Sequence, residues 1–209
     1  MKVFLLYLLF LSMLAVSCHK KSPDTRLSCC ARDHAIGRPS TLSPALTDGS
    51  IYRLPGNWTD QHDRSFSLGE LKGKVQVVAM IFTHCGYACP RIVADMKNME
   101  DSLPAALSKN VDFVLVSFDS DRDTPARLHE FAAEEHLDNH WTLLHGGKDQ
   151  VRELSMLLDV KYQRLPDGNF AHSNVVVMLN KEGEMVRHDD ATERNAGLAV
   201  TTIRQLLDR

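Results

Sequence analysis

The sequence has no long block of charges of one sign: 24 Lys and Arg residues stand against 27 Asp and Glu residues, with a formal net charge of −3. Nucleic-acid binding needs a concentrated basic surface, so this composition predicts no nucleic-acid partner. Internal repeats and low-complexity tracts are also missing. The one long apolar run, residues 3–16, is shorter than the roughly 20 residues of a membrane-spanning helix.

That apolar run has the features of an export signal. It follows Lys2 and ends in small residues before Cys18. Residues 14–18 resemble a bacterial lipoprotein box, in which Cys18 becomes the lipidated first residue; an ordinary signal peptide with an incidental cysteine is the alternative. We expect a signal peptide over 1–17, a flexible polar tether over 18–48 and one folded domain over 49–209. The protein would then be exported and lipid-anchored on the periplasmic side of a bacterial membrane.

Cysteines are few, and apart from Cys18 they fall in two close pairs, Cys29 with Cys30 and Cys85 with Cys89. Close pairing favours metal or redox chemistry over a disulfide framework, which a domain of this size does not need. A structural Cys85–Cys89 disulfide remains an alternative, although closing so short a loop stabilises little.

The hydrophobic pattern predicts alternating strands and helices. Strands are expected over 50–54, within 58–66, and over 75–82, 111–118, 141–144, 161–165, 174–179 and 184–187; helices are expected over 90–107, 125–136, 148–158 and 195–207. This order implies an α/β protein with a mixed central sheet flanked by helices and an N-terminal β extension. A βαβ unit followed by a ββα unit, with a cysteine pair after the first central strand, resembles the thioredoxin fold.

Cys85 and Cys89 are therefore expected in the loop between a buried strand and a helix, where α/β proteins place functional groups. Pro90 suits the first helical position, which would put Cys89 at the helix N-terminus and favour its thiolate. His172 directly precedes the penultimate strand, whose start lies beside this loop in a thioredoxin-like sheet. Two thiolates and an imidazole form a donor set that suits Cu(I) and tolerates Cu(II).

The chain resembles the Sco/SenC family over about residues 50–208. The resemblance is carried by Thr83-x-Cys85-x3-Cys89-Pro90, by the segment 121–125 (Asp-Arg-Asp-Thr-Pro), and by His172-Ser173 before a strand and a Gly183 turn. It implies an exported copper protein that assists assembly of the binuclear CuA centre of cytochrome c oxidase. Cys85, Cys89 and His172 would be the copper ligands, and the two cysteines would also cycle between dithiol and disulfide.

Two residues depart from the family pattern. Many members have proline after the first cysteine and aspartate before the histidine, where this chain has Gly86 and Ala171. Gly86 is expected to loosen the loop. Ala171 removes a carboxylate that could orient the histidine or contact a partner.

Two functions fit these residues. The first is a membrane-tethered copper chaperone that receives copper from a periplasmic donor and passes it to the CuA-bearing oxidase subunit. The alternative is a thiol–disulfide reductase that keeps the copper-ligand cysteines of a partner reduced, with a thioredoxin-like protein as its own reductant. A peroxidase is disfavoured because the peroxiredoxin pattern Pro-x3-Thr-x2-Cys does not precede Cys85.

Other candidate residues receive weaker predictions. His84 is expected to turn away from Cys85, and Asp119, Asp121 and Asp123 are interpreted as capping residues, with a docking surface as the alternative. His129, His136 and His140 show no metal-ligand spacing and are expected to be exposed. Cys29 and Cys30, with His19 and His34, can form an auxiliary copper-capturing patch, although a plain spacer is favoured.

Overall fold

Strand β3 (Val75–Ile81) is the centre of the sheet, and all of its residues are buried. Its apolar run has no polar face because neighbouring elements cover both of its sides. The computed structural model describes residues 46–86, 88–190 and 195–208. The predictions on the signal peptide, Cys18, Cys29, Cys30, His19 and His34 lie outside the described residues.

Within this part of the chain, β3 belongs to a seven-stranded mixed sheet with the order β2-β1-β5-β4-β3-β8-β9. β3, β4 (Val111–Ser117) and β5 (Trp141–His145) are parallel. The antiparallel strands are β8 (Val175–Leu179) and β9 (Met185–Asp190) on one side, and β1 (Trp58–Asp60) and β2 (Ser65–Phe66) on the other.

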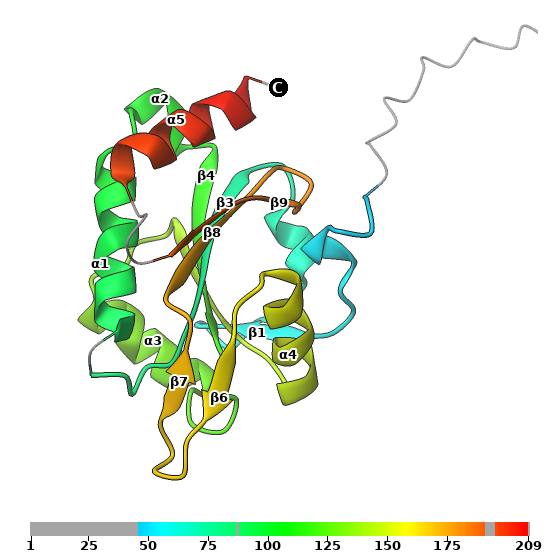
Figure 1. Cartoon of the computed structure of the whole chain (residues 1–209), viewed down its shortest axis with the longest axis vertical. Helices are drawn as coiled ribbons and strands as arrows, with labels where there is room; N and C mark the ends of the chain where they lie inside the picture. The colour runs from blue at the N-terminus through cyan, green and yellow to red at the C-terminus, as the bar shows by residue number, and fades with distance from the viewer. Residues whose placement is uncertain (1–45, 87, 191–194, 209) are drawn as a thin grey trace, which may run out of the picture. The chain divides into compact units, whose positions relative to one another are not determined.

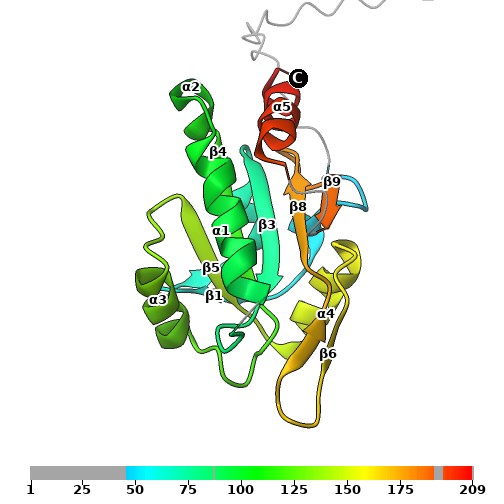
Figure 2. The same cartoon turned by 60° about the vertical axis from the view of Figure 1, so that its left-hand side comes forward.

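Helices cover both faces of the sheet. α1 (Ala88–Asp101), α3 (Pro125–Glu134) and α5 (Ala196–Leu207) lie on one face, and α4 (Lys148–Leu157) lies on the other (Figures 1 and 2). This arrangement confirms the predicted thioredoxin-like fold with its mixed sheet. It also brings the loop after β3 to the same end of the sheet as the short strand β7 (Phe170–His172).

Two predicted elements differ from the structure. The strand expected over 50–54 is wrong: Ile51–Arg53 forms the 3₁₀ helix η1, because Ser50 caps it through Oγ, which accepts a hydrogen bond from Tyr52 N (3.3 Å). The β extension is the β1–β2 hairpin instead, and a second 3₁₀ helix, η2, covers Leu68–Leu71. The helix expected over 90–107 is interrupted before Pro104, which begins the separate short helix α2 (Ala105–Ser108).

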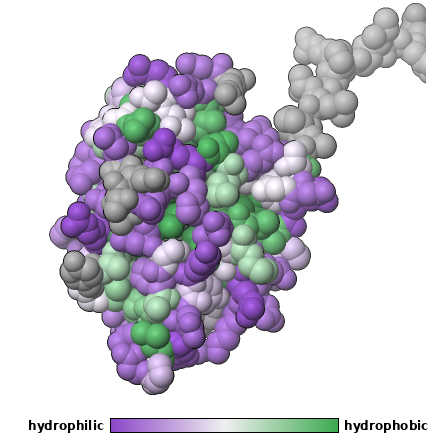
Figure 3. Space-filling model, viewed as in Figure 1, coloured by the Kyte–Doolittle hydropathy of each residue, from purple (hydrophilic) through white to green (hydrophobic). Residues whose placement is uncertain are grey.

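The strand expected over 161–165 is real, but it does not extend the main sheet. β6 (Tyr162–Arg164) pairs only with β7 in a two-stranded sheet of the described residues. This hairpin projects from the body of the domain, and Leu165 at its tip is 38% exposed. Figure 3 shows a hydrophobic patch at this lower end within a mostly hydrophilic face.

Candidate metal and thiol site

A buried carboxylate holds the loop that carries the two cysteines. Asp123 has no solvent exposure and accepts hydrogen bonds from Thr83 N (2.8 Å), Thr83 Oγ1 (2.7 Å) and Ser117 Oγ (2.6 Å). Arg127 Nε donates to the same Thr83 hydroxyl (3.1 Å). The residues just before Cys85 are therefore tied to the end of β4 and the start of α3.

Cys89 lies in the first turn of α1 and is fully buried, whereas Cys85 is only half-buried. Neither cysteine forms a disulfide bond in the structure. Cys89 Sγ accepts a hydrogen bond from Phe82 N (3.4 Å), and Cys89 N donates to Cys85 Sγ (3.5 Å). The more accessible thiol of the pair is therefore Cys85.

The expectation that Cys89 is held as a thiolate is wrong for this structure. Burial raises the pKa of the Cys89 thiol far above its ordinary value, and the hydrogen bond from Phe82 N lowers it only in part. Helix α1 also begins at Ala88, so that Cys89 lies inside the helix rather than before it. Desolvation of the charged form therefore outweighs the favourable helix dipole at this position.

His172 completes the site from the opposite side. Its Nε2 lies 4.0 Å from Cys89 Sγ, and the donor atoms of Cys85, Cys89 and His172 all lie within 4.8 Å of one another. Its Nδ1 is 2.9 Å from the Ser173 carbonyl oxygen, to which only a protonated Nδ1 can donate. This tautomer leaves the Nε2 lone pair directed at the cysteines, as a metal ligand requires.

Aromatic side chains surround the imidazole. The His172 ring lies 5.1 Å from the Phe118 ring and 6.0 Å from the Phe82 ring, and Phe170 contacts both phenylalanines. Tyr162, which faces His172 across the β6–β7 pair, stacks on Phe118. These contacts keep water from one side of the site and limit rotation of the histidine.

Both residues that depart from the family pattern are exposed. Ala171 is exposed and lies on the outer side of β7, and the orientation of His172 comes from a backbone carbonyl rather than from residue 171. A Cβ atom added to Gly86 would meet nothing within 4 Å, so there is room for a larger residue at this position.

His84 turns toward the acidic residues, a contact that the sequence did not predict. Its Nδ1 lies 3.2 Å from Thr83 Oγ1 and 3.4 Å from Asp123 Oδ1, and its side chain is 46% exposed. The ligand atoms of His84, Asp119 and Asp123 lie within 4.8 Å of one another, but Arg122 pairs with Asp119 and Arg127 contacts Thr83. The Arg122 guanidinium thus already neutralises Asp119, whereas the ion pairs of Arg127 are with Glu130 and Glu134.

The capping interpretation of the three aspartates is wrong for α3, whose cap is Thr124. Thr124 caps α3 by accepting from Arg127 N, whereas Asp121 forms exposed ion pairs with Lys148 (2.8 Å) and Arg164 (2.6 Å). The role of Asp123 in holding the cysteine loop was missed, because its partner Thr83 lies 40 residues away in the sequence.

The fold and this site define a thioredoxin-like protein with two thiols and one imidazole converging on a single point. The SCO1/SenC family model matches residues 48–208, and the chain belongs to this family. No helix of the described residues is both long and apolar enough to span a membrane.

Relatives support this assignment. The chain is 27% identical over 145 residues to the SCO1 protein homolog of Bacillus subtilis strain 168, covering 66% of this chain and 74% of that one. A SCO1/SenC family lipoprotein from Bacillus anthracis superposes with a TM-score of 0.67 at 24% identity, covering 78% of this chain and 99% of that chain. Copper-bound ScoI from Bradyrhizobium japonicum superposes with a TM-score of 0.63 at 22% identity, covering 73% and 97%.

Proposed function

We propose that this protein is an exported, membrane-tethered copper chaperone that assists assembly of the CuA centre of cytochrome c oxidase. The observation that carries the proposal is the convergence of Cys85, Cys89 and His172 within 4.8 Å. Two sulfur donors and one imidazole nitrogen form a set that suits Cu(I) and tolerates Cu(II). Family membership, the copper-bound state of Bradyrhizobium japonicum ScoI and the description of the Sco family as cytochrome c oxidase assembly proteins support it.

The difference in exposure between the sulfurs suits delivery by ligand exchange. Cys85 is half-buried and can meet an incoming thiolate of the partner, whereas Cys89 is buried and retains the ion until transfer. The partner would be the CuA-bearing oxidase subunit, and a periplasmic copper donor would load the site. Lipid attachment at Cys18 would keep the domain near the membrane, in line with the lipoprotein relative from Bacillus anthracis.

A thiol–disulfide reductase is the second candidate, favoured by the accessible Cys85 beside a second thiol. The Cys85 thiolate would attack a disulfide of the partner, form a mixed disulfide and release one partner thiolate. Cys89, after losing its proton, would then attack Cys85 Sγ, releasing the second partner thiolate and leaving a Cys85–Cys89 disulfide. Two electrons pass to the partner, and a thioredoxin-like reductant restores the dithiol.

Copper titration of the reduced protein tests the first function. We expect one tightly bound Cu(I), with sulfur-dominated coordination by X-ray absorption, and a large loss of affinity in Cys85→Ser. Undiminished affinity in that variant would refute the ligand assignment. His172→Ala separates the two functions, because it removes a copper ligand and spares both thiols; His140→Ala is the matched control, since His140 is a partly exposed loop histidine outside the site.

Membrane attachment needs its own test. Cys18→Ser should move the exported protein from the membrane to the soluble fraction, and mass spectrometry of the unsubstituted protein should detect acyl chains on Cys18. A membrane-bound Cys18→Ser protein would contradict the lipoprotein assignment.

A further inference from the structure

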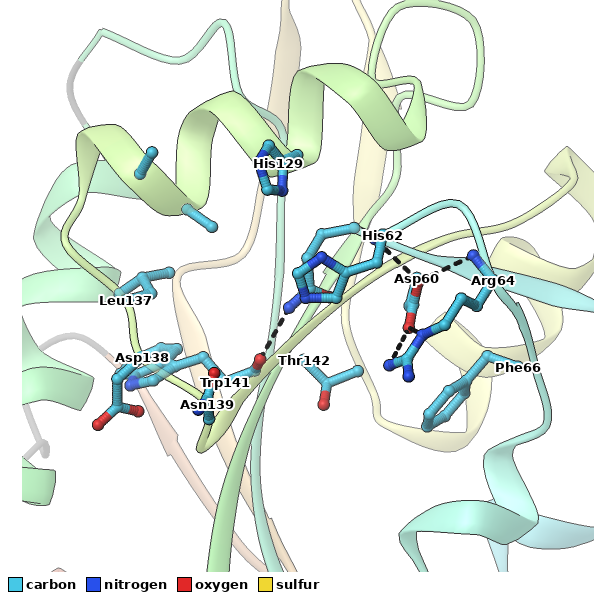
Figure 4. Close-up of a pocket in the computed structure, with 13 residues that line it drawn as sticks. Asp60, His62, Arg64, Phe66, His129, Leu137, Asp138, Asn139, Trp141 and Thr142 are labelled. Atoms are coloured by element: carbon cyan, nitrogen blue, oxygen red, sulfur yellow. Dashed lines mark hydrogen bonds and ion pairs between the residues drawn. The ribbon is translucent and has the colours of Figure 1, made fainter.

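Two histidines face each other away from the cysteine site. His62 lies in the turn after β1 and His129 lies on α3, and their ring centroids are 5.5 Å apart with the planes inclined at 66°. Figure 4 shows the rings opposed across the top of a hollow of about 470 Å³, which both residues line. They also line a second hollow with Asp63 and Glu130, and none of the proposed copper ligands lines either one.

Firm structure supports both rings. His62 N and Arg64 N donate to Asp60 Oδ1 (2.8 and 3.0 Å), which fixes the turn between β1 and β2. The Arg64 guanidinium pairs with Asp60 Oδ2 (2.7 Å), so the nearest arginine of the hollow is already neutralised. His129 follows the fully buried Leu128, which anchors α3 to the core.

The separation of the rings matches that of two imidazoles that share a metal ion. With each nitrogen about 2.0–2.1 Å from the ion in tetrahedral or trigonal geometry, the ring centroids lie about 5–5.5 Å apart. Both side chains are exposed, and the terminal torsion of histidine is broad, so the nitrogens can turn toward a common point. In the described residues no hydrogen bond holds either imidazole in another orientation.

We propose that His62 and His129 form a second metal site for a borderline divalent ion, Cu(II) or Zn(II), distinct from the cysteine site. Imidazole nitrogens suit these ions, and the two rings would supply both protein ligands. Asp63 and Glu130 line the same hollow, but neither belongs to a group of three ligand atoms within 4.8 Å with the two histidines. Cu(I), which prefers sulfur, would remain with Cys85 and Cys89. This proposal does not depend on the role of the cysteine site.

Zinc titration of the full chain tests the site, with the imidazole nitrogen resonances of each histidine followed by NMR. This readout is specific to each residue, so zinc bound by thiols elsewhere does not interfere. The signals of His62 and His129 should shift together with a single midpoint. His62→Ala and His129→Gln should each weaken zinc binding at the remaining histidine at least tenfold, and His140→Ala should leave the midpoint unchanged.

Three results would overturn the proposal: no shift of the two rings, shifts with separate midpoints, or unchanged binding at one histidine after loss of the other. Each would mean that the rings only pack edge to face. Both substitutions replace exposed side chains, and the amide spectrum recorded in the same experiment shows that the fold persists.

Discussion

Replacing Asp123 tests whether the buried carboxylate holds the cysteine loop in place. In the unsubstituted protein, Asp123 accepts three hydrogen bonds from Thr83 and Ser117. Asp123→Asn keeps the size of this side chain and removes its charge. The amide oxygen can still accept from Thr83 N and Ser117 Oγ, but the amide NH₂ group then faces Thr83 Oγ1. In the variant the acceptor side chain is no longer charged, and the Thr83 hydroxyl must turn away from the amide NH₂ group.

A hydrogen bond to a charged group contributes about 1.5–3 kcal/mol, and a neutral one about 0.5–1.5 kcal/mol. Because most of the three bonds survive in weaker form, we expect Asp123→Asn to lower the free energy of unfolding by about 2–3 kcal/mol. Copper affinity should also fall about tenfold, because each 1.4 kcal/mol lost from loop ordering lowers a binding constant by that factor.

Urea unfolding and Cu(I) competition with a chelator measure the two effects. Asp121→Asn is the matched control, because Asp121 lies two positions away and forms exposed ion pairs with Lys148 and Arg164. Loss of these exposed pairs should change neither the free energy of unfolding nor the copper affinity appreciably. A double-mutant cycle with Thr83→Val isolates the contact itself. An Asp123→Asn protein with the urea midpoint and copper affinity of the control would refute the anchoring role.

Four further outcomes are expected. His172→Ala should weaken Cu(II) binding much more than Cu(I) binding in chelator competition, because two thiolates alone can hold Cu(I); equal losses would contradict the ligand role. The full chain and a chain beginning at Ser50 should bind the same number of Cu(I) ions under reducing conditions, whereas an extra, weaker equivalent would make Cys29 and Cys30 a capturing patch. Gly183→Ala should lower stability in urea by about 2 kcal/mol, because Gly183 has φ +80° and an added Cβ would lie 2.8 Å from the Tyr52 ring; Gly86→Ala, which meets no atom, is the control. Burial opposes ionisation of Asp60, but hydrogen bonds from Arg64 and His62 lower its pKa overall. The stability that the ionised Asp60 carboxylate contributes is therefore present at neutral pH and is lost as the pH falls below about 4. Asp60→Asn should therefore make the unfolding free energy flatter with pH in that acid range, and an unchanged slope would contradict this reading.

The sequence alone determined the central strands and the start of α3. β3, β4 and β8 are buried on both faces, and such strands are continuous apolar runs that can be read directly. Thr124 and Pro125 begin α3 through contacts within one turn, so they too are visible locally. The close spacing of Cys85 and Cys89, with the family motif around them, was enough to predict a candidate site in the loop after β3.

Tertiary structure decided the environment of each group in that site. The spacing of the cysteines did not reveal that Cys89 is buried inside α1, since burial depends on the packing of β3 and α1 rather than on neighbours in sequence. Likewise the pattern of residues 50–54 suits a strand, but the Ser50 cap and the burial of two consecutive side chains, Ile51 and Tyr52, produce a 3₁₀ helix.

Contacts between distant segments were the other part that only the fold determined. Asp123 reaches Thr83, His172 reaches Cys89, and His62 faces His129, each pair separated by many residues and joined only when the sheet brings their loops together. Local patterns report which backbone shape a segment prefers, because side chains three or four positions apart interact along a helix and alternate positions share a face of a strand. They carry no information on which loops meet at the end of a sheet, and it is there that the donor atoms of this protein converge.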